Sequence, residues 1–148
     1  MQNINPNQPA IAIQPMSIDD YDDVMALWLG TPELTVRTAF DTRERIDAYI
    51  ARNPGLSQVA WDDSRLVGAV LCGHDGRRGS LYHMCVAVDC RGRGVGRLLV
   101  ERCVAGLKEQ GIDSAFLFVH DQNPSAADFW QKLGCEPATE IGYWSLSF

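Results

Sequence analysis

The segment DCRGRGVGRLL, residues 89–99, constrains the fold of this chain more than any other stretch. It holds three arginines and three glycines, between the apolar run SLYHMCVAV (80–88) and a helical pattern that continues to about Gln110. Clustered glycines are unfavourable inside regular structure, but in a tight turn they permit left-handed dihedral angles and close approach to a ligand. The first amides of the following helix lack intrahelical partners and carry partial positive charge. The segment therefore predicts a strand, a turn and a helix that together bind an anion such as phosphate.

Apolar periodicity predicts the elements on either side of this segment. Ser17 has the position of a helix N-cap and Gly30 that of a helix stop, while Asp41 is expected to cap a second helix that ends before Pro54. Further strands are predicted at 10–16, 56–61, 65–73 and 114–120, further helices at 17–30, 42–53 and 124–134, and one or two final strands within 136–148. This order predicts an α/β (α+β) fold with a mixed central sheet of about six to seven strands and about four helices.

Three known phosphate-binding loops compete for the glycine-rich turn. A Walker A loop requires Gly-Lys-Ser/Thr after four intervening residues, and this sequence has none. A dinucleotide fingerprint requires G-x-G-x-x-G; Gly92 and Gly94 fit it, but the third position is Arg97. The remaining pattern is R-x-x-G-x-G, formed by Arg91, Gly94 and Gly96.

A second motif accompanies that loop. The stretch NPSAADFWQKLGCE begins at Asn123 and has Ala126, Phe129, Leu133 and Gly134 at fixed spacing. Together the two motifs and the order of elements resemble the GNAT superfamily of acetyltransferases, in particular its small stand-alone bacterial members, over about residues 10–147. The resemblance implies an N-acetyltransferase that moves an acetyl group from acetyl-CoA, its co-substrate, to a primary amine of a small molecule or protein by direct attack in a ternary complex.

The resemblance also assigns a donor site. It implies that the main chain of the strand 80–88 binds the pantetheine arm, that the turn amides bind the pyrophosphate, and that Asn123 reaches the amide or thiol end. The residues so assigned are Met84, Cys85, Val86, Arg91, Gly92, Arg93, Gly94, Val95, Gly96, Asn123 and Trp130.

The residues that move protons are less clear from the sequence. Trp130 occupies the position where the family usually has a general-acid tyrosine, and an indole N–H has no usable acidity. Candidate catalytic residues are therefore His83 and His120 as the base, since a histidine suits a base near neutral pH, and Tyr82 as a replacement for the general-acid tyrosine. Glu33, in the irregular segment 31–40, is the candidate for binding a cationic acceptor.

Composition excludes other classes of protein. A net charge of −6 argues against nucleic-acid binding, and no apolar run is long enough for a membrane span. Residues 1–9 lack signal-peptide features and are expected to form a flexible polar lead before a single acetyltransferase domain, residues 10–148. Five scattered cysteines without paired spacing predict neither disulfides nor a metal site, which favours a cytoplasmic location.

Three further hypotheses stay open at this stage. Trp130 motivates an alternative function, a CoA-binding sensor or interaction module with little transferase activity. A nucleotide-binding oxidoreductase is disfavoured by Arg97. The apolar residues of the C-terminal segment IGYWSLSF, 141–148, are candidates for pairing between subunits, so a homodimer is one expected assembly.

Overall fold

The computed structural model describes residues 10–148. The lead predicted for residues 1–9 lies outside the described residues. The chain forms two compact units, one that ends at Phe118 and one that runs from Val119 to Phe148. The prediction of a single domain over 10–148 stays a prediction.

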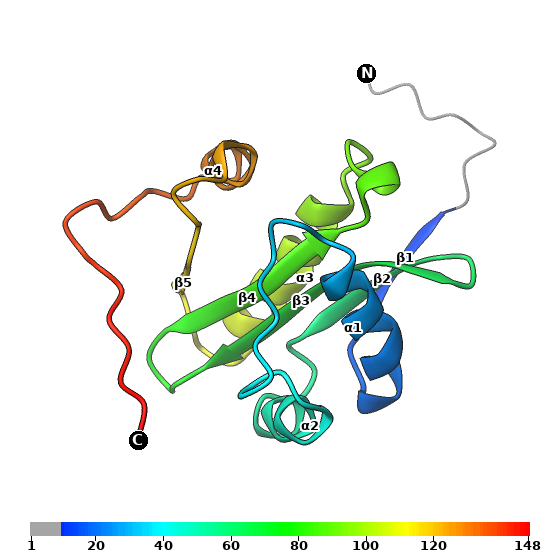
Figure 1. Ribbon diagram of the computed structural model, residues 1–148, viewed down its shortest axis with the longest axis horizontal. Coiled ribbons are helices and arrows are strands. Elements are labelled where there is room, and N and C mark those ends of the chain that lie inside the picture. Colours follow the sequence, from blue (N-terminus) through cyan, green and yellow to red (C-terminus); the bar gives the residue numbers. More distant parts are fainter. Residues whose placement is uncertain (1–9) are drawn as a thin grey trace. The chain divides into compact units, whose positions relative to one another are not determined.

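The sheet lies in the first unit (Figure 1). Its strands follow the order β1-β2-β3-β4-β5, and neighbours are antiparallel except β4 and β5, which are parallel. The parallel pair is joined by a helical crossover, as expected from the sequence. The elements of this unit are β1 (Ile11–Pro15), the 3-10 helix η1 (Ile18–Asp20), α1 (Tyr21–Leu29), α2 (Arg43–Arg52), β2 (Gln58–Asp62), β3 (Arg65–His74), β4 (Gly79–Val86), the 3-10 helix η2 (Val88–Cys90), α3 (Val95–Glu109) and β5 (Ala115–Leu117).

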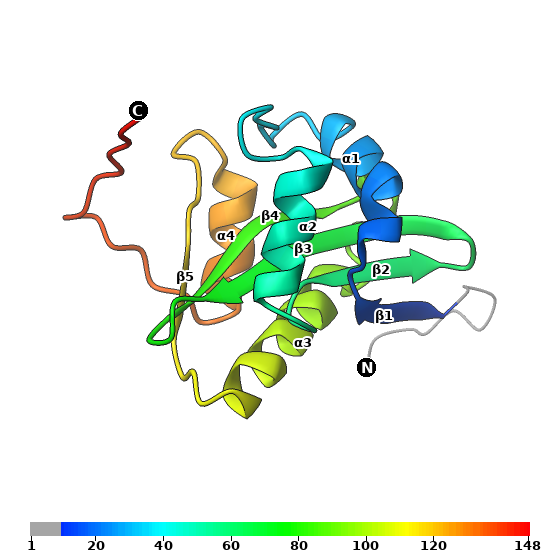
Figure 2. The same cartoon turned by 90° about the horizontal axis from the view of Figure 1, so that it is seen from below.

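Helices α1 and α2 cover one face of the sheet, and α3 covers the other (Figure 2). Two glycines of β3 mark these faces. A Cβ atom added at Gly68 would lie 3.0 Å from a methyl group of Leu99 on α3, whereas one at Gly73 would lie 2.6 Å from the hydroxyl of Tyr49 on α2. Their separation of five residues is odd, so they point to opposite faces of the strand.

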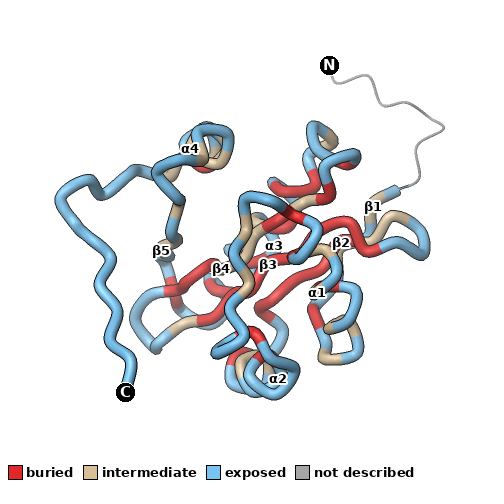
Figure 3. Tube along the Cα trace, viewed as in Figure 1, coloured by how far each residue is buried: buried red, intermediate tan, exposed pale blue. Residues whose placement is uncertain are grey.

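The core follows from this two-sided covering. Strand β3 is buried from Leu66 to Gly73, and the buried residues of β2 and β4 flank it (Figure 3). A strand covered on both faces has a nearly continuous apolar sequence, as VGAVLC does here. On the α1 and α2 side the core cluster consists of Met16, Val24, Trp28, Ile46, Val59, Leu66, Ala69, Leu71 and Cys85.

Helix ends follow local capping chemistry. Ser17 forms the predicted N-terminal cap, as a capping box with Asp20. The prediction that Asp41 caps α2 is wrong: the N-cap is Thr42, whose hydroxyl accepts a hydrogen bond from the Arg45 amide at 3.3 Å. Thr42 directly precedes the first helical residue, so Asp41 stands one position too early. No helix within residues 10–148 is long and apolar enough to cross a membrane.

The second unit contains α4 (Pro124–Lys132), with Pro124 in its first turn as predicted. The one or two strands expected within 136–148 are absent, and β5 is shorter than the predicted 114–120. The described sheet therefore has five strands instead of six to seven. Tyr143, Trp144 and Leu146 are exposed, and side chains that bury little apolar area provide little packing energy to hold a strand.

We expect Gly73→Ala to lower the free energy of unfolding by about 1–3 kcal/mol, because the new methyl group overlaps well-packed atoms. The added methyl group would lie 2.6 Å from the hydroxyl of Tyr49 and 2.7 Å from the side-chain amide of Asn53. Asn53 cannot move without losing hydrogen bonds to the Tyr49 carbonyl (3.2 Å) and from the His74 amide (3.1 Å). Urea unfolding measures the effect. Gly142→Ala, in the exposed C-terminal segment, is the control, with a change within about 0.5 kcal/mol; equal losses in both variants would contradict the packing argument.

Candidate active site

The edge of β4 changes character half-way along the strand. Its pairing with β5 covers Gly79, Ser80 and Leu81 and ends there. From Tyr82 to Val86, no other described strand takes up the pairing on that side. Backbone amides and carbonyls on an unpaired strand edge are available to a ligand that lies along it.

A β-bulge interrupts β4 where this free edge begins. Ala69 of β3 pairs with Cys85 and Leu71 pairs with Tyr82, so Val70 alone stands opposite His83 and Met84. His83 has φ +51°, in the left-handed region that non-glycine residues seldom occupy. Such bulges change the direction of a side chain relative to the regular strand. Here the His83 ring packs edge-on against Trp28 of α1, with ring centroids 4.8 Å apart.

The predicted candidate His83 has a carboxylate partner. Its Nε2 atom lies 3.0 Å from both carboxylate oxygens of Asp41, which the sequence analysis assigned to a helix cap. The Asp41 side chain is only 6% exposed, whereas that of His83 keeps 23% of its surface exposed. The carboxylate also accepts a hydrogen bond from the Arg37 amide at 2.7 Å. A buried carboxylate is therefore satisfied by a backbone amide and an imidazole.

The turn after β4 leads to the N-terminus of α3, whose first amides have no intrahelical hydrogen-bond partner. Gly92 and Gly94 both have φ +79°, and an added Cβ at either would contact nothing within 4 Å. Left-handed backbone, and not crowding, is thus what these positions require. Gly94 is the N-cap of α3 and provides no side-chain cap, and the first helical hydrogen bond runs from the Leu98 amide to the Gly94 carbonyl. The amides of Val95, Gly96 and Arg97 precede that bond, as at any helix N-terminus.

The arginines of the turn make different contacts. The Arg91 Nε atom donates to the Val86 carbonyl at 3.2 Å, and its guanidinium lies 3.6 Å from the carboxylate of Glu33. Glu33, predicted to bind the amine acceptor, and Arg91, predicted to bind acetyl-CoA, therefore form an ion pair. Arg93 instead donates to Asp62 at the end of β2, at 3.0 Å, and this hydrogen bond raises the pKa of Arg93.

The remaining residues predicted on β4 line the same edge. Tyr82 is half-buried between the rings of Tyr49 and Phe118. Met84 and Val86 are half-buried, and Cys85 is buried. Burial raises the pKa of the Cys85 thiol to about 12, so that this thiol is neutral near pH 7.

Three predicted residues belong to the second unit. The exposed His120 accepts a hydrogen bond from the Gln122 amide through Nδ1, at 3.3 Å. Asn123 is the N-cap of α4 and accepts from the Ala126 amide at 3.2 Å. Trp130 is buried and packs edge-on against Phe129. Within their own unit, these side chains shape and pack α4.

Comparison with known proteins identifies the family of this chain. A sequence model described as the acetyltransferase (GNAT) family matches residues 21–135. The chain belongs to this family. An acetyltransferase of Pectobacterium atrosepticum is 33% identical over 118 residues, which cover 80% of this chain and 82% of the relative.

Solved GNAT-type structures share the fold. A probable acetyltransferase of Staphylococcus aureus superposes with a TM-score of 0.72 at 18% identity, and the match covers 94% of this chain and 100% of the other. The PaiA N-acetyltransferase of Thermoplasma acidophilum, solved in complex with coenzyme A, gives a TM-score of 0.71 at 20% identity, covering 84% and 88%. The mixed α/β fold predicted from the sequence is thus confirmed.

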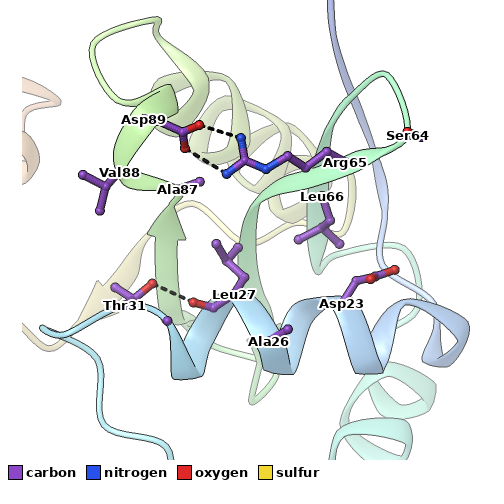
Figure 4. A pocket seen from close by; sticks show the side chains of 11 residues that line it. Asp23, Ala26, Leu27, Thr31, Ser64, Arg65, Leu66, Ala87, Val88 and Asp89 are labelled. Atoms are coloured by element: carbon purple, nitrogen blue, oxygen red, sulfur yellow. Dashed lines mark hydrogen bonds and ion pairs between the residues drawn. The ribbon is translucent and has the colours of Figure 1, made fainter.

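This GNAT member has a pocket that no sequence motif indicated. It measures about 580 Å³ and lies between α1, the β2–β3 turn and η2 (Figure 4). Arg65 and Asp89 form an ion pair on its wall, at 2.6 Å, and none of the predicted site residues lines it. No group of three or more histidine, cysteine or acidic side chains within residues 10–148 is arranged to hold a metal ion.

The contact that sequence reasoning missed in this acetyltransferase is the one between His83 and Asp41. The two residues are 42 positions apart, and neither belongs to a recognisable motif. The position of Asp41, an acidic residue just before a helix, indicated only that it would cap that helix. Only the folding of the 31–42 segment across β4 brings the pair together.

We expect Arg93→Ala to lower the urea midpoint of unfolding more than Arg65→Ala does. The Arg93 and Asp62 side chains are 19% and 17% exposed, whereas those of Arg65 and Asp89 are 56% and 65% exposed. Losing a partner costs more where the remaining charge is shielded from water. Urea unfolding of both variants, monitored by circular dichroism, tests the order; a larger loss for Arg65→Ala would contradict it.

Proposed function

We propose that this GNAT member transfers an acetyl group from acetyl-CoA to a primary amine by direct attack in a ternary complex. The observation that carries the proposal is that the unpaired edge of β4 is followed, after η2 and the glycine-rich turn, by the N-terminus of α3, whose first amides lack intrahelical partners. An extended acyl chain with amide groups suits the first part of this path, and a pyrophosphate suits the second. Coenzyme A has both in that order.

The anion end of the path has suitable electrostatics. Left-handed Gly92 and Gly94 leave space next to the turn, and the amides of Val95, Gly96 and Arg97 carry the positive end of the α3 dipole. Arg91 adds a guanidinium that is 42% exposed and so accessible to a phosphate. Arg93 contributes chiefly by tying the turn to β2, while its amide belongs to the same backbone path.

The thioester end of the path lies at the bulge. The free edge of β4 would hold the pantetheine arm through backbone hydrogen bonds, and the thioester would then lie near His83 and Met84. A main-chain N–H near Val86 would stabilise the oxyanion of the tetrahedral intermediate. Holding the thioester and the amine together contributes further, because a bimolecular step becomes effectively unimolecular.

Direct attack is favoured over a covalent acetyl-enzyme. A thiolate is the nucleophile in such a pathway, and the raised pKa of Cys85 keeps the thiol on this edge protonated. Cys72, Cys90 and Cys103 are buried in the core. The amine itself is therefore the better nucleophile for the acetyl group.

The 31–40 segment supports an amine acceptor. Glu33 lies beside the turn through its contact with Arg91, and its carboxylate side chain is 40% exposed. Its pKa is lowered by a backbone hydrogen bond and by Arg91, so it is ionised at neutral pH. A phosphate that takes over Arg91 leaves the Glu33 carboxylate available to a cationic amine.

We expect acetyl-CoA at 100 times its dissociation constant to stabilise the wild-type protein by about 2.7 kcal/mol, seen as a rise in Tm. Gly94→Trp should abolish this rise, because the indole fills the open space at the first turn of α3. Thermal denaturation with and without acetyl-CoA measures both effects.

Gly111→Trp is the matched control. Gly111 also has φ +79° and open space around its Cβ position, but it follows the C-terminus of α3. Both variants carry the same backbone strain, and only Gly94→Trp should lose the response to acetyl-CoA. Absence of any shift in the wild type contradicts the proposed function. Binding of CoA without acetylation of a peptide α-amine, a lysine peptide, spermidine or an aminoglycoside favours the alternative of a CoA-binding sensor.

A further inference from the structure

We propose that Asp41 is a positioning residue that holds the His83 imidazole in the tautomer able to accept a proton from the attacking amine. This inference rests on the proposed function, since it assigns the proton acceptor for that reaction. It starts from the contact between Nε2 of His83 and both oxygens of Asp41, each at 3.0 Å.

The Asp41 carboxylate is held in place by hydrogen bonds other than the one to His83. Its oxygen Oδ2 accepts the Arg37 amide at 2.7 Å, and the Asp41 carbonyl accepts the Tyr21 hydroxyl at 2.6 Å. These bonds tie Asp41 to its own loop and to α1. Because the side chain is 6% exposed, little water competes for its oxygens.

The ring is fixed independently. Trp28, which is fully buried, contacts it edge-on, and the bulge in β4 sets the direction in which the side chain leaves the backbone. The left-handed conformation of His83 is an uncommon one whose energetic cost the surrounding contacts offset. Two packed elements therefore orient the imidazole toward Asp41.

This geometry determines which nitrogen carries the proton. A carboxylate only accepts hydrogen bonds, so Nε2 of the neutral ring must carry the hydrogen that it shares with Asp41. The second nitrogen, Nδ1, then has a lone pair. The described residues offer Nδ1 no hydrogen-bond partner, and the ring is 23% exposed.

The position of the ring suits the reaction. His83 stands at the start of the unpaired β4 edge, beside Met84 and the proposed thioester site. Nδ1 takes one proton from the ammonium form of the acceptor, which frees its electron pair to form the N–C bond. The C–S bond then breaks, the thiolate leaves with the electron pair of that C–S bond, and it takes the second amine proton through water. The imidazolium returns its proton to solvent, so the ring ends the cycle neutral.

The first experiment reads the tautomer directly. Long-range ¹H–¹⁵N spectra are recorded on the whole protein at an alkaline pH at which the His83 signals no longer change with pH. We expect His83 to show a protonated Nε2 and an unprotonated Nδ1 in the wild type. In Asp41→Asn the amide oxygen stays with the Arg37 N–H, so the NH₂ group faces Nε2 and shifts the ring toward the Nδ1–H form.

The second experiment measures turnover of the amine panel with acetyl-CoA. His83→Asn removes the base with a residue that tolerates the left-handed conformation, and we expect kcat to fall about 100-fold or more. Asp41→Asn should lower kcat about 10- to 100-fold, with little change in the KM for acetyl-CoA. In the double variant, Asp41→Asn should cost almost nothing further, because both residues act through one ring nitrogen.

His74→Gln is the control for replacing a histidine. His74 bonds to Gln110 at 2.7 Å, at the far end of β3, and its replacement should leave turnover unchanged. Circular dichroism and the acetyl-CoA thermal shift show whether each variant is folded and binds the donor. An Nδ1–H tautomer in the wild type, or independent costs of the two substitutions, would overturn the inference while leaving the proposed function intact. Loss of the acetyl-CoA shift in the wild type would instead overturn the proposed function.

Discussion

The early end of the pairing between β4 and β5 is the constraint on which the rest of the site depends. Three residue pairs join these strands, and from Tyr82 onward one side of β4 has no strand neighbour among residues 10–148. An unpaired strand edge usually favours aggregation, because its free N–H and C=O groups can pair with another chain. Here it lies beside a bulge and is followed along the chain by a helix N-terminus, so the free backbone edge, the redirected His83 side chain and the proposed anion site come from one short stretch of sequence.

Much of this arrangement could be predicted because it is local. The glycines at 92, 94 and 96, the strand before them and the helix after them are neighbours in sequence, so their chemistry indicates their structure. The capping box at Ser17 and the proline at the start of α4 are equally local signals. The family assignment follows from the same short motifs.

The rest of the site could not be predicted, because it depends on contacts between distant segments. Asp41 meets His83 only when the irregular 31–42 segment crosses β4, and Arg93 meets Asp62 only when the turn folds against β2. The C-terminal segment has alternating apolar residues that favour a strand, yet Trp144 and Leu146 are exposed. Residue pattern indicates a preference, whereas burial decides whether that preference is realised.

The glycines of the turn have a consequence for handedness. Gly92 and Gly94 have φ +79°, and an added Cβ at either would contact nothing within 4 Å. Glycine is therefore needed here for its left-handed backbone conformation, and not because a side chain would clash. A D-alanine favours that conformation for the same steric reason that an L-alanine avoids it. A semisynthetic protein with D-alanine at 94 would keep the turn while restricting the unfolded chain. The turn therefore requires a backbone conformation that L-residues avoid, and glycine, the one achiral residue of the genetic code, adopts it without a steric penalty.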